Sequence, residues 1–263
     1  MQFVFDLISD LHIETWDGQF DWQGQATSPI CVVAGDVCRD HDTLKQTLTH
    51  LGKCYHSVLY IDGNDEHKNH WYSLSDNYQS LDSTVNGCPN VVFLQDNLVI
   101  INGVAILGTN GWWTWDFDQL GDPEQSQQWF QDRTHCSNIT PFIIEQFAEN
   151  DANYLESSIR RLQTHPDVKR IVVVTHTVPG RHFVQHDLSL IDSHRINVMG
   201  NSHMPRILEA DSQQKISHWC FGHYHSKVDQ VVNGVRYVNN CRGRGDTDYH
   251  QSVYYPLRIE INY

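Results

Sequence analysis

Short runs of apolar, mostly β-branched residues alternate with longer polar stretches along the chain, and this pattern predicts an α/β fold. The expected single strands are Phe3–Ile8, Ile30–Ala34, Val58–Ile61, Val91–Leu94, Ile171–Thr175, His218–Phe221 and Leu257–Ile261. Asn-Gly pairs predict two hairpins, one within Leu98–Leu107 at Asn102–Gly103 and one within Lys227–Val238 at Asn233–Gly234.

The polar stretches between these runs predict helices near Thr43–Leu51, His67–Leu81 and Pro141–Gln163. There is no Ser/Gly-rich linker and no internal repeat. We therefore expect a single domain over residues 1–263, with an aromatic-rich insertion at about 111–140. An unstructured connection of that length is uncommon unless it is functional.

Composition narrows the possible functions. The 18 basic and 32 acidic residues give a net charge of −14, which disfavours stable binding to nucleic acid or to an anionic membrane. We find no run of apolar residues long enough for a transmembrane helix and no secretory signal, and the seven cysteines are dispersed, so we expect a cytoplasmic protein with reduced thiols. The 17 histidines are a first indication of metal chemistry.

Metal-ligating residue types follow five of the predicted strands, each at its carboxyl end. These residues are Asp10 and His12, Asp36, Asn64, His176, and His223 with His225. Each short motif is weak evidence by itself, because Asp-x-His also occurs at Asp65/His67 and at Asp248/His250. Sites of open α/β sheets assemble at the carboxyl edge of the strands, so the repeated placement predicts one common site.

The donor types suit a pair of divalent cations. Carboxylate and amide oxygens favour Mn²⁺ or Mg²⁺, and imidazole favours Zn²⁺, Fe or Mn²⁺. A glycine precedes Asp36, Asn64 and His223, which lets the backbone turn sharply beside the ions. One carboxylate has to bridge two ions that lie about 3.5–4 Å apart.

The ordered set D-x-H, G-D, G-N, H and G-H-x-H, which spans Phe3 to about Gly245, resembles the signature of the calcineurin-like metallophosphoesterase superfamily. The resemblance implies a four-layer α/β/β/α sandwich of two mixed sheets flanked by helices. It also implies two divalent ions, with Mn, Fe or Zn favoured over Mg. One ion would be held by Asp10, His12, Asp36 and His225, and the other by Asp36, Asn64, His176 and His223.

Such a centre accounts for phosphoric ester hydrolysis on an acidic protein. Two divalent ions exceed the charge of Asp10, Asp36 and a bridging hydroxide, so the centre is a positive spot that attracts a small phosphorylated substrate, nucleotides included. The bridging hydroxide would attack phosphorus in line, and neighbouring imidazoles would help to neutralise the equatorial oxygens.

The chain departs from the family pattern at the third motif, where Gly63–Asn64–Asp65–Glu66 replaces the usual G-N-H-E or G-N-H-D. The resemblance assigns leaving-group assistance to the histidine that Asp65 replaces. An ionised carboxylate is a poor proton donor, and His67 is the nearest histidine that could substitute. We therefore expect a phosphodiesterase, with a general phosphomonoesterase or a non-catalytic protein-binding scaffold as the alternatives.

Three further features allow two interpretations each. Arg242 could contact a phosphate oxygen or serve only in a glycine-rich turn, and Glu66 could take part in the site or only orient its neighbours. The aromatic residues of the insertion could form a lid that stacks on the substrate or a small hydrophobic subcore. They are Trp112, Trp113, Trp115, Phe117, Trp129 and Phe130.

Overall fold

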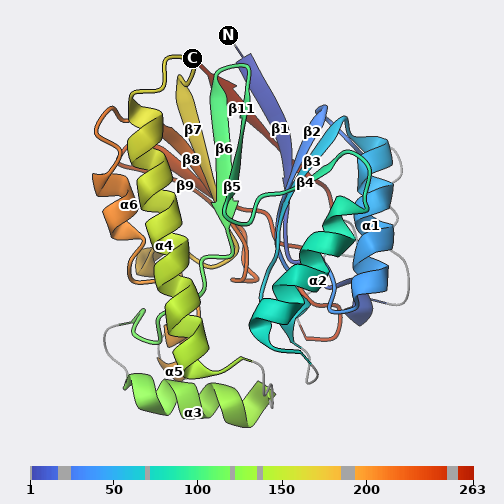
Figure 1. Ribbon diagram of the computed structural model, residues 1–263, viewed down its shortest axis with the longest axis vertical. Helices are drawn as coiled ribbons and strands as arrows, with labels where there is room; N and C mark the ends of the chain where they lie inside the picture. The colour runs from blue at the N-terminus through green and yellow to red at the C-terminus, as the bar shows by residue number, and fades with distance from the viewer. Residues whose placement is uncertain are drawn as a thin grey trace.

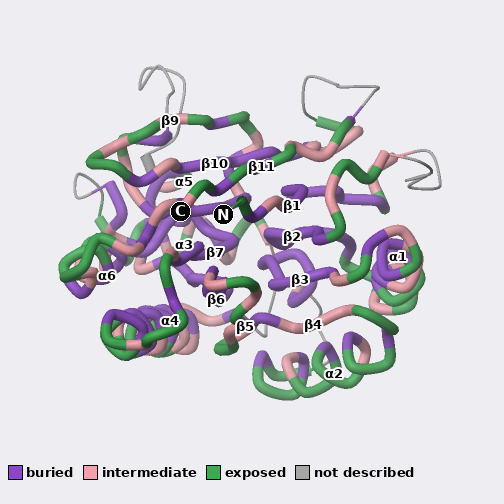
Figure 2. Tube along the Cα trace, turned by 90° about the horizontal axis from the view of Figure 1, so that it is seen from above, coloured by how far each residue is buried: buried purple, intermediate pink, exposed green. Residues whose placement is uncertain are grey.

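Two β-sheets pack face to face and carry helices on their outer surfaces in the computed structural model (Figures 1 and 2). The structure describes residues 2–16, 25–68, 72–118, 122–134, 139–184, 193–247 and 254–263. The first sheet has the order β11 (Leu257–Asn262), β1 (Gln2–Ile8), β2 (Ile30–Ala34), β3 (Ser57–Ile61) and β4 (Val91–Phe93). The second has the order β5 (Asn97–Ile101), β6 (Val104–Thr109), β7 (Arg170–Thr175), β8 (Ile216–Phe221), β10 (Val235–Asn239) and β9 (Val228–Val232).

Both sheets are mixed, since only β11, β5 and β9 run antiparallel to their neighbours among the described strands. Helices α1 (His41–Cys54) and α2 (Leu74–Asn86) cover the first sheet, and α4 (Pro141–Gln163) with α6 (Pro205–Glu209) covers the second (Figure 2). The expected four-layer sandwich is therefore confirmed. Helices α3 (Pro123–Thr134) and α5 (Ser193–Asn197) lie at the end of the molecule opposite the two termini (Figure 1).

The central strands β2, β6 and β7 are buried on both faces, which explains their continuous apolar runs. In β2, Val32 belongs to the hydrophobic cluster between the sheets, whereas Val33 belongs to the cluster under α1 and α2. In β7, Val172 faces the other sheet and Val173 faces α4. This alternation follows from the two-residue repeat of a strand, and it fixes the register of the central strands.

The central strands β1, β2 and β3 are parallel, and so are β6, β7, β8 and β10. Their carboxyl ends consequently meet at one edge of the sandwich. Both predicted hairpins are present, and each Asn-Gly pair has positive φ angles, 48° and 80° at Asn102 and Gly103 and 50° and 83° at Asn233 and Gly234. Two consecutive positive φ angles are what a tight hairpin turn needs.

Two segments differ from the sequence expectation. The expected helix from His67 is replaced by a short 3₁₀ turn, η2 (Asp65–His67), and α2 begins only at Leu74, where the side chain of Ser73 accepts a hydrogen bond from the backbone N–H of Asp76. The insertion at 111–140 contains α3, which hydrophobic periodicity did not indicate. Within the described residues, we find no helix with the length and apolar character needed to cross a bilayer.

Candidate metal centre

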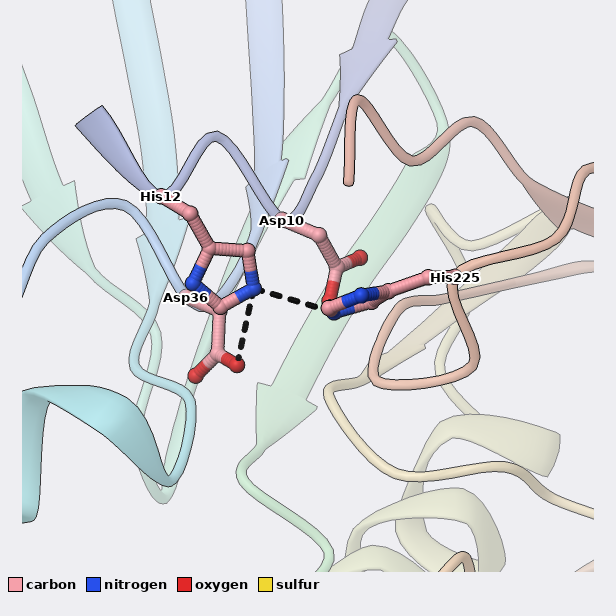
Figure 3. A group of neighbouring side chains, drawn as sticks. All are labelled: Asp10, His12, Asp36 and His225. Carbon is pink, nitrogen blue, oxygen red and sulfur yellow. Dashed lines mark hydrogen bonds and ion pairs between the residues drawn. The ribbon is translucent and has the colours of Figure 1, made fainter. Parts of the chain in front are cut away.

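Asp10, His12, Asp36 and His225 converge at the carboxyl ends of β1, β2 and β8 (Figure 3). One ligand atom from each residue lies within 4.8 Å of the others. The Nε2 atoms of His12 and His225 are 2.9 Å apart, and Nε2 of His12 is 3.5 Å from Oδ2 of Asp36. Nε2 of His225 is 3.5 Å from Oδ1 of Asp10.

Asp36, His176 and His223 form a second group with the same spacing. Oδ1 of Asp36 is 3.3 Å from Nε2 of His176, and that nitrogen is 3.2 Å from Oδ1 of Asn64. Asp36 therefore directs one carboxylate oxygen toward each group. This is the geometry that a carboxylate shared by two cations requires.

Several features of these residues fit bound cations. Oδ2 of Asp10 is buried, and among the described residues it has no hydrogen-bond partner. An isolated buried carboxylate oxygen is costly, and a divalent cation removes that cost. The Nε2 atoms of His12 and His225 face each other with carboxylates on both sides, and carboxylate, amide and imidazole together suit borderline divalent metals.

The side chains of the two groups respond strongly to one another's charge. Burial lowers the pKa of His12, but Asp65, Glu14 and Asp36 outweigh it and raise that pKa to about 10. Burial likewise lowers the pKa of His176, but the carboxylate of Asp36 outweighs it and raises that pKa to about 10. The same negative potential that favours the protonated histidines would stabilise a bound divalent cation.

The backbone at the centre adopts conformations that L-residues rarely take. Asp10, His12, Asp36 and His223 have φ angles of 51°, 41°, 53° and 63°. Each left-handed residue costs roughly 1 kcal/mol or more, and such strain is concentrated at functional sites. The strand-to-loop turns thus place the ligands at an energetic cost.

The glycines that precede Asp36, Asn64 and His223 act mainly by allowing the backbone to approach the ligand side chains closely. A Cβ on Gly63 would overlap Oδ1 of Asp36, and a Cβ on Gly35, which has φ 83°, would overlap the ring of His176. A Cβ on Gly222 would lie 2.7 Å from Oδ2 of Asp10. Only glycine lets the loops pass so near the ligands.

A shell of hydrogen bonds orients the ligands. The carboxylate of Glu66 accepts the backbone N–H groups of Asp36, Val37 and Gly63 at 3.2, 2.6 and 2.9 Å. Glu66 therefore orients the loop that carries Asp36. This was one of the two interpretations of Glu66 that the sequence allowed. Nε2 of His223 is 2.9 Å from the carbonyl oxygen of Val198, which leaves Nδ1 of His223 to face the centre.

Asp65 lies beside His12, and its Oδ1 accepts a hydrogen bond from the side-chain amide of Asn64 at 3.0 Å. Its Oδ2 is 3.4 Å from Nδ1 of His12. Burial raises the pKa of Asp65, but Lys68, His12 and Arg39 outweigh it and hold the pKa well below its usual range. Asp65 is therefore ionised and cannot supply a proton to a leaving group.

The other two candidate catalytic residues are placed differently. The ring of His67 is fully buried, with Nε2 at 2.7 Å from Asp62 and Nδ1 at 3.0 Å from the amide of Asn77. Both nitrogens are engaged inside the protein, so we do not retain the hypothesis that His67 replaces the missing histidine. The guanidinium of Arg242 lies over the indole of Trp16, 4.1 Å from the ring centroid.

The aromatic insertion forms a subcore. Trp112, Trp113 and Trp115 are almost completely buried and cluster with Phe130 and residues of α4. The ring of Trp113 also stacks on His223, with centroids 5.9 Å apart and planes inclined by 14°. Sequence reasoning did not foresee this contact, because no local pattern relates two residues so distant in the chain.

Sequence reasoning also missed three cations that surround Asp65, namely Arg39, Lys68 and Arg244. The signal available for them was weak. Lys68 stands three positions after Asp65, and Arg242-Gly-Arg244 is a basic pair within a glycine turn of an acidic chain.

Comparison with solved structures supports the fold. A phosphopantetheinyl hydrolase from Mycobacterium tuberculosis superposes with a TM-score of 0.69 at 16% identity, covering 92% of this chain and 90% of that one. A dimetal phosphatase from Danio rerio superposes with a TM-score of 0.51 at 12% identity, covering 90% and 86%. No protein-family model matches the sequence, and a search of well-characterised proteins finds no match either. The chain therefore shares its fold with these two proteins.

Proposed function

We propose that this chain is a metal-dependent hydrolase of phosphoric esters. The observation that carries the proposal is the position of Asp36, whose two carboxylate oxygens face two separate groups of buried and half-buried ligands. When bound, a pair of divalent ions would supply a hydroxide nucleophile near neutral pH and would bind the phosphate oxygens. Mn²⁺, Fe²⁺ and Zn²⁺ are the ions that this mixture of carboxylate, amide and imidazole favours.

The preferred substrates are phosphodiesters and other esters with good leaving groups. A monoester of an alcohol needs a proton on its departing oxygen, and Asp65 stands where the family resemblance expects a histidine. Lys68 and Arg39 hold Asp65 ionised, and His67 is enclosed. Neither residue can therefore act as the general acid, whereas an aryl or phosphate leaving group departs without one.

The two structural neighbours are consistent with this proposal. One is described as a phosphopantetheinyl hydrolase and the other as a dimetal phosphatase. At 16% and 12% identity they support the fold, and the chemistry rests on the residues of this chain.

The test is a substrate panel of alkyl monoesters, aryl diesters and cyclic nucleotides, each assayed with Mn²⁺, Zn²⁺, Fe²⁺ and Mg²⁺. We expect diesters to be hydrolysed faster than monoesters. Asp65→His should raise monoesterase relative to diesterase activity, whereas Asp229→His, on the exposed side of β9, should leave that ratio unchanged. Hydrolysis of no ester with any metal would instead favour a protein-binding scaffold.

A further inference from the structure

Three cationic side chains from three different loops converge on the single carboxylate of Asp65. Arg39 approaches Oδ2 with Nε and Nη2, each at 3.1 Å, and Arg244 approaches the same oxygen with Nη1 at 2.9 Å. Lys68 bonds Oδ1 of Asp65. This Asp65-centred basic cluster (Arg39, Lys68 and Arg244) adjoins the ligand groups, because Asp65 also contacts the ring of His12 and the side-chain amide of Asn64.

The cluster has more donors than its carboxylate can accept. A carboxylate offers about four acceptor sites, whereas two guanidinium groups and an ammonium carry several times as many N–H donors. Asp65 is covered, with 1% of its side chain exposed, but Arg39, Arg244 and Lys68 are 42%, 21% and 18% exposed. Arg39, the most exposed of the three, therefore presents part of its guanidinium to a ligand arriving from solvent.

Two acidic groups lie near the cluster but make only long contacts with it. Glu14 is 3.9 Å from Nε of Arg39, and Asp246 is 3.6 Å from Nε of Arg244. Both distances exceed those of a good hydrogen bond, so the two acids reduce the local positive potential without forming tight ion pairs with the cluster. The chain has a net charge of −14, so three cations gathered around one residue beside the metal-ligand groups are unusual for this protein.

The loop that carries Arg244 is fixed against the loop that carries His12. The backbone N–H of Gly243 donates to the carbonyl oxygen of Asp10 at 3.0 Å, and the N–H of Gly245 donates to Oγ1 of Thr15 at 2.9 Å. A Cβ on Gly245 would lie 2.5 Å from the carbonyl oxygen of Thr15. Arg244 is thus held in place before any ligand arrives, as a binding residue should be.

We propose that the Asp65-centred basic cluster binds the second phosphate of diphosphate-linked substrates, so that the favoured reaction is hydrolysis of a diester of diphosphoric acid. The inference rests on the proposed function. Water oxygen bonds to one phosphorus, the bridging P–O bond breaks, and its electron pair leaves with the second phosphate. The water protons pass to solvent, and two phosphate monoesters are the products.

The chemistry of the departing group favours this substrate class. A departing phosphate monoester needs no general acid, because its second pKa is about 6. The departing group also gains negative charge as the bond breaks, and the half-exposed guanidinium of Arg39 would stabilise that charge. One cluster thus provides both recognition and leaving-group stabilisation.

The test compares kcat/KM for diadenosine diphosphate with kcat/KM for thymidine 5′-(p-nitrophenyl phosphate), a diester without a second phosphate. Arg39→Gln, Lys68→Gln and Arg244→Gln should each lower kcat/KM for the diphosphate by about tenfold more than for the p-nitrophenyl ester, as loss of a charged hydrogen bond predicts. Arg39→Lys should restore part of the loss. Arg236→Gln, which breaks a similar pair with Asp229 on the β9–β10 hairpin, is the matched control and should change neither value.

The outcomes separate this inference from the function on which it rests. Equal losses on both esters would mean that the cations only position Asp65 and His12, which would overturn the inference and leave the proposed function standing. A wild-type enzyme that hydrolyses the p-nitrophenyl ester but not the diphosphate would do the same. If neither ester is hydrolysed with any of the four metals, both proposals fail.

Discussion

The indole of Trp113 lies nearly parallel to the imidazole of His223, with 5.9 Å between ring centroids. Together with the carbonyl oxygen of Val198, it fixes the plane of His223 so that the free ring nitrogen faces Asp36 and His176. The aromatic insertion therefore supports the candidate metal centre through the buried side chain of Trp113, which packs against His223.

Replacing Trp113 with Leu should weaken the second ligand group. Loss of an outer contact to a metal-ligating histidine typically reduces metal affinity by about 10- to 100-fold. Calorimetric titration of the metal-free protein should show one ion bound more weakly, with the other little changed. Trp129→Leu, also in the insertion but outside the His223 stack, serves as the control, and equal affinities in both variants would contradict the assigned role of Trp113.

Gly63→Ala should disable the centre. The added Cβ would overlap Oδ1 of Asp36, so the carboxylate would have to move away from at least one ligand group. We expect loss of more than one hundredfold in diesterase activity together with reduced metal stoichiometry, because ångström-scale displacements at such sites have effects of this size.

The matched control for that variant is Gly87→Ala, at the end of α2. A Cβ there would meet its neighbours at 3.4 Å or more, which is ordinary contact distance. Gly87→Ala should keep full activity. A Gly63→Ala protein that binds two ions as well as wild type would argue against the close approach of Gly63 to Asp36.

Asp151 should make the stability of the metal-free protein depend on pH. It accepts the backbone N–H groups of Gly111 and Trp112 at 2.7 and 3.1 Å, and burial, followed by the nearby Asp96, raises its pKa to about 8. Between the unfolded value of 3.8 and about 8, the folded state holds a proton that the unfolded state releases, so stability falls as pH rises.

The measurement is urea unfolding in chelator across pH 5 to 8, for wild type and for Asp151→Asn. An asparagine can still accept both N–H groups but has no proton to lose, so its profile should be flatter than that of wild type. Parallel profiles would show that Asp151 has the same pKa in both states.

The main strands and the ligand set could be predicted because both depend on local patterns. Val32 and Val33 fill opposite faces of one strand, which requires a continuous apolar run, and Asp36 stands directly after that strand. Parallel strand order then brings such residues together without any further information.

The features that were missed depend on contacts between distant segments. Arg244 lies 179 positions from Asp65, and nothing in the neighbourhood of either residue indicates their 2.9 Å contact. The enclosure of His67 by Asp62 and Asn77 depends on where α2 begins, which Ser73 decides. Helix α3 was missed because it is strongly polar and only Ser126 and Phe130 are buried in it, so no hydrophobic periodicity marks it.

The central claim is that Asp36 is shared by two cations, and anomalous diffraction from crystals grown with Mn²⁺ tests it most directly. The account predicts two Mn²⁺ peaks about 3.5–4 Å apart, each in contact with a different oxygen of Asp36. A single peak, or two ions with no common ligand, would contradict it.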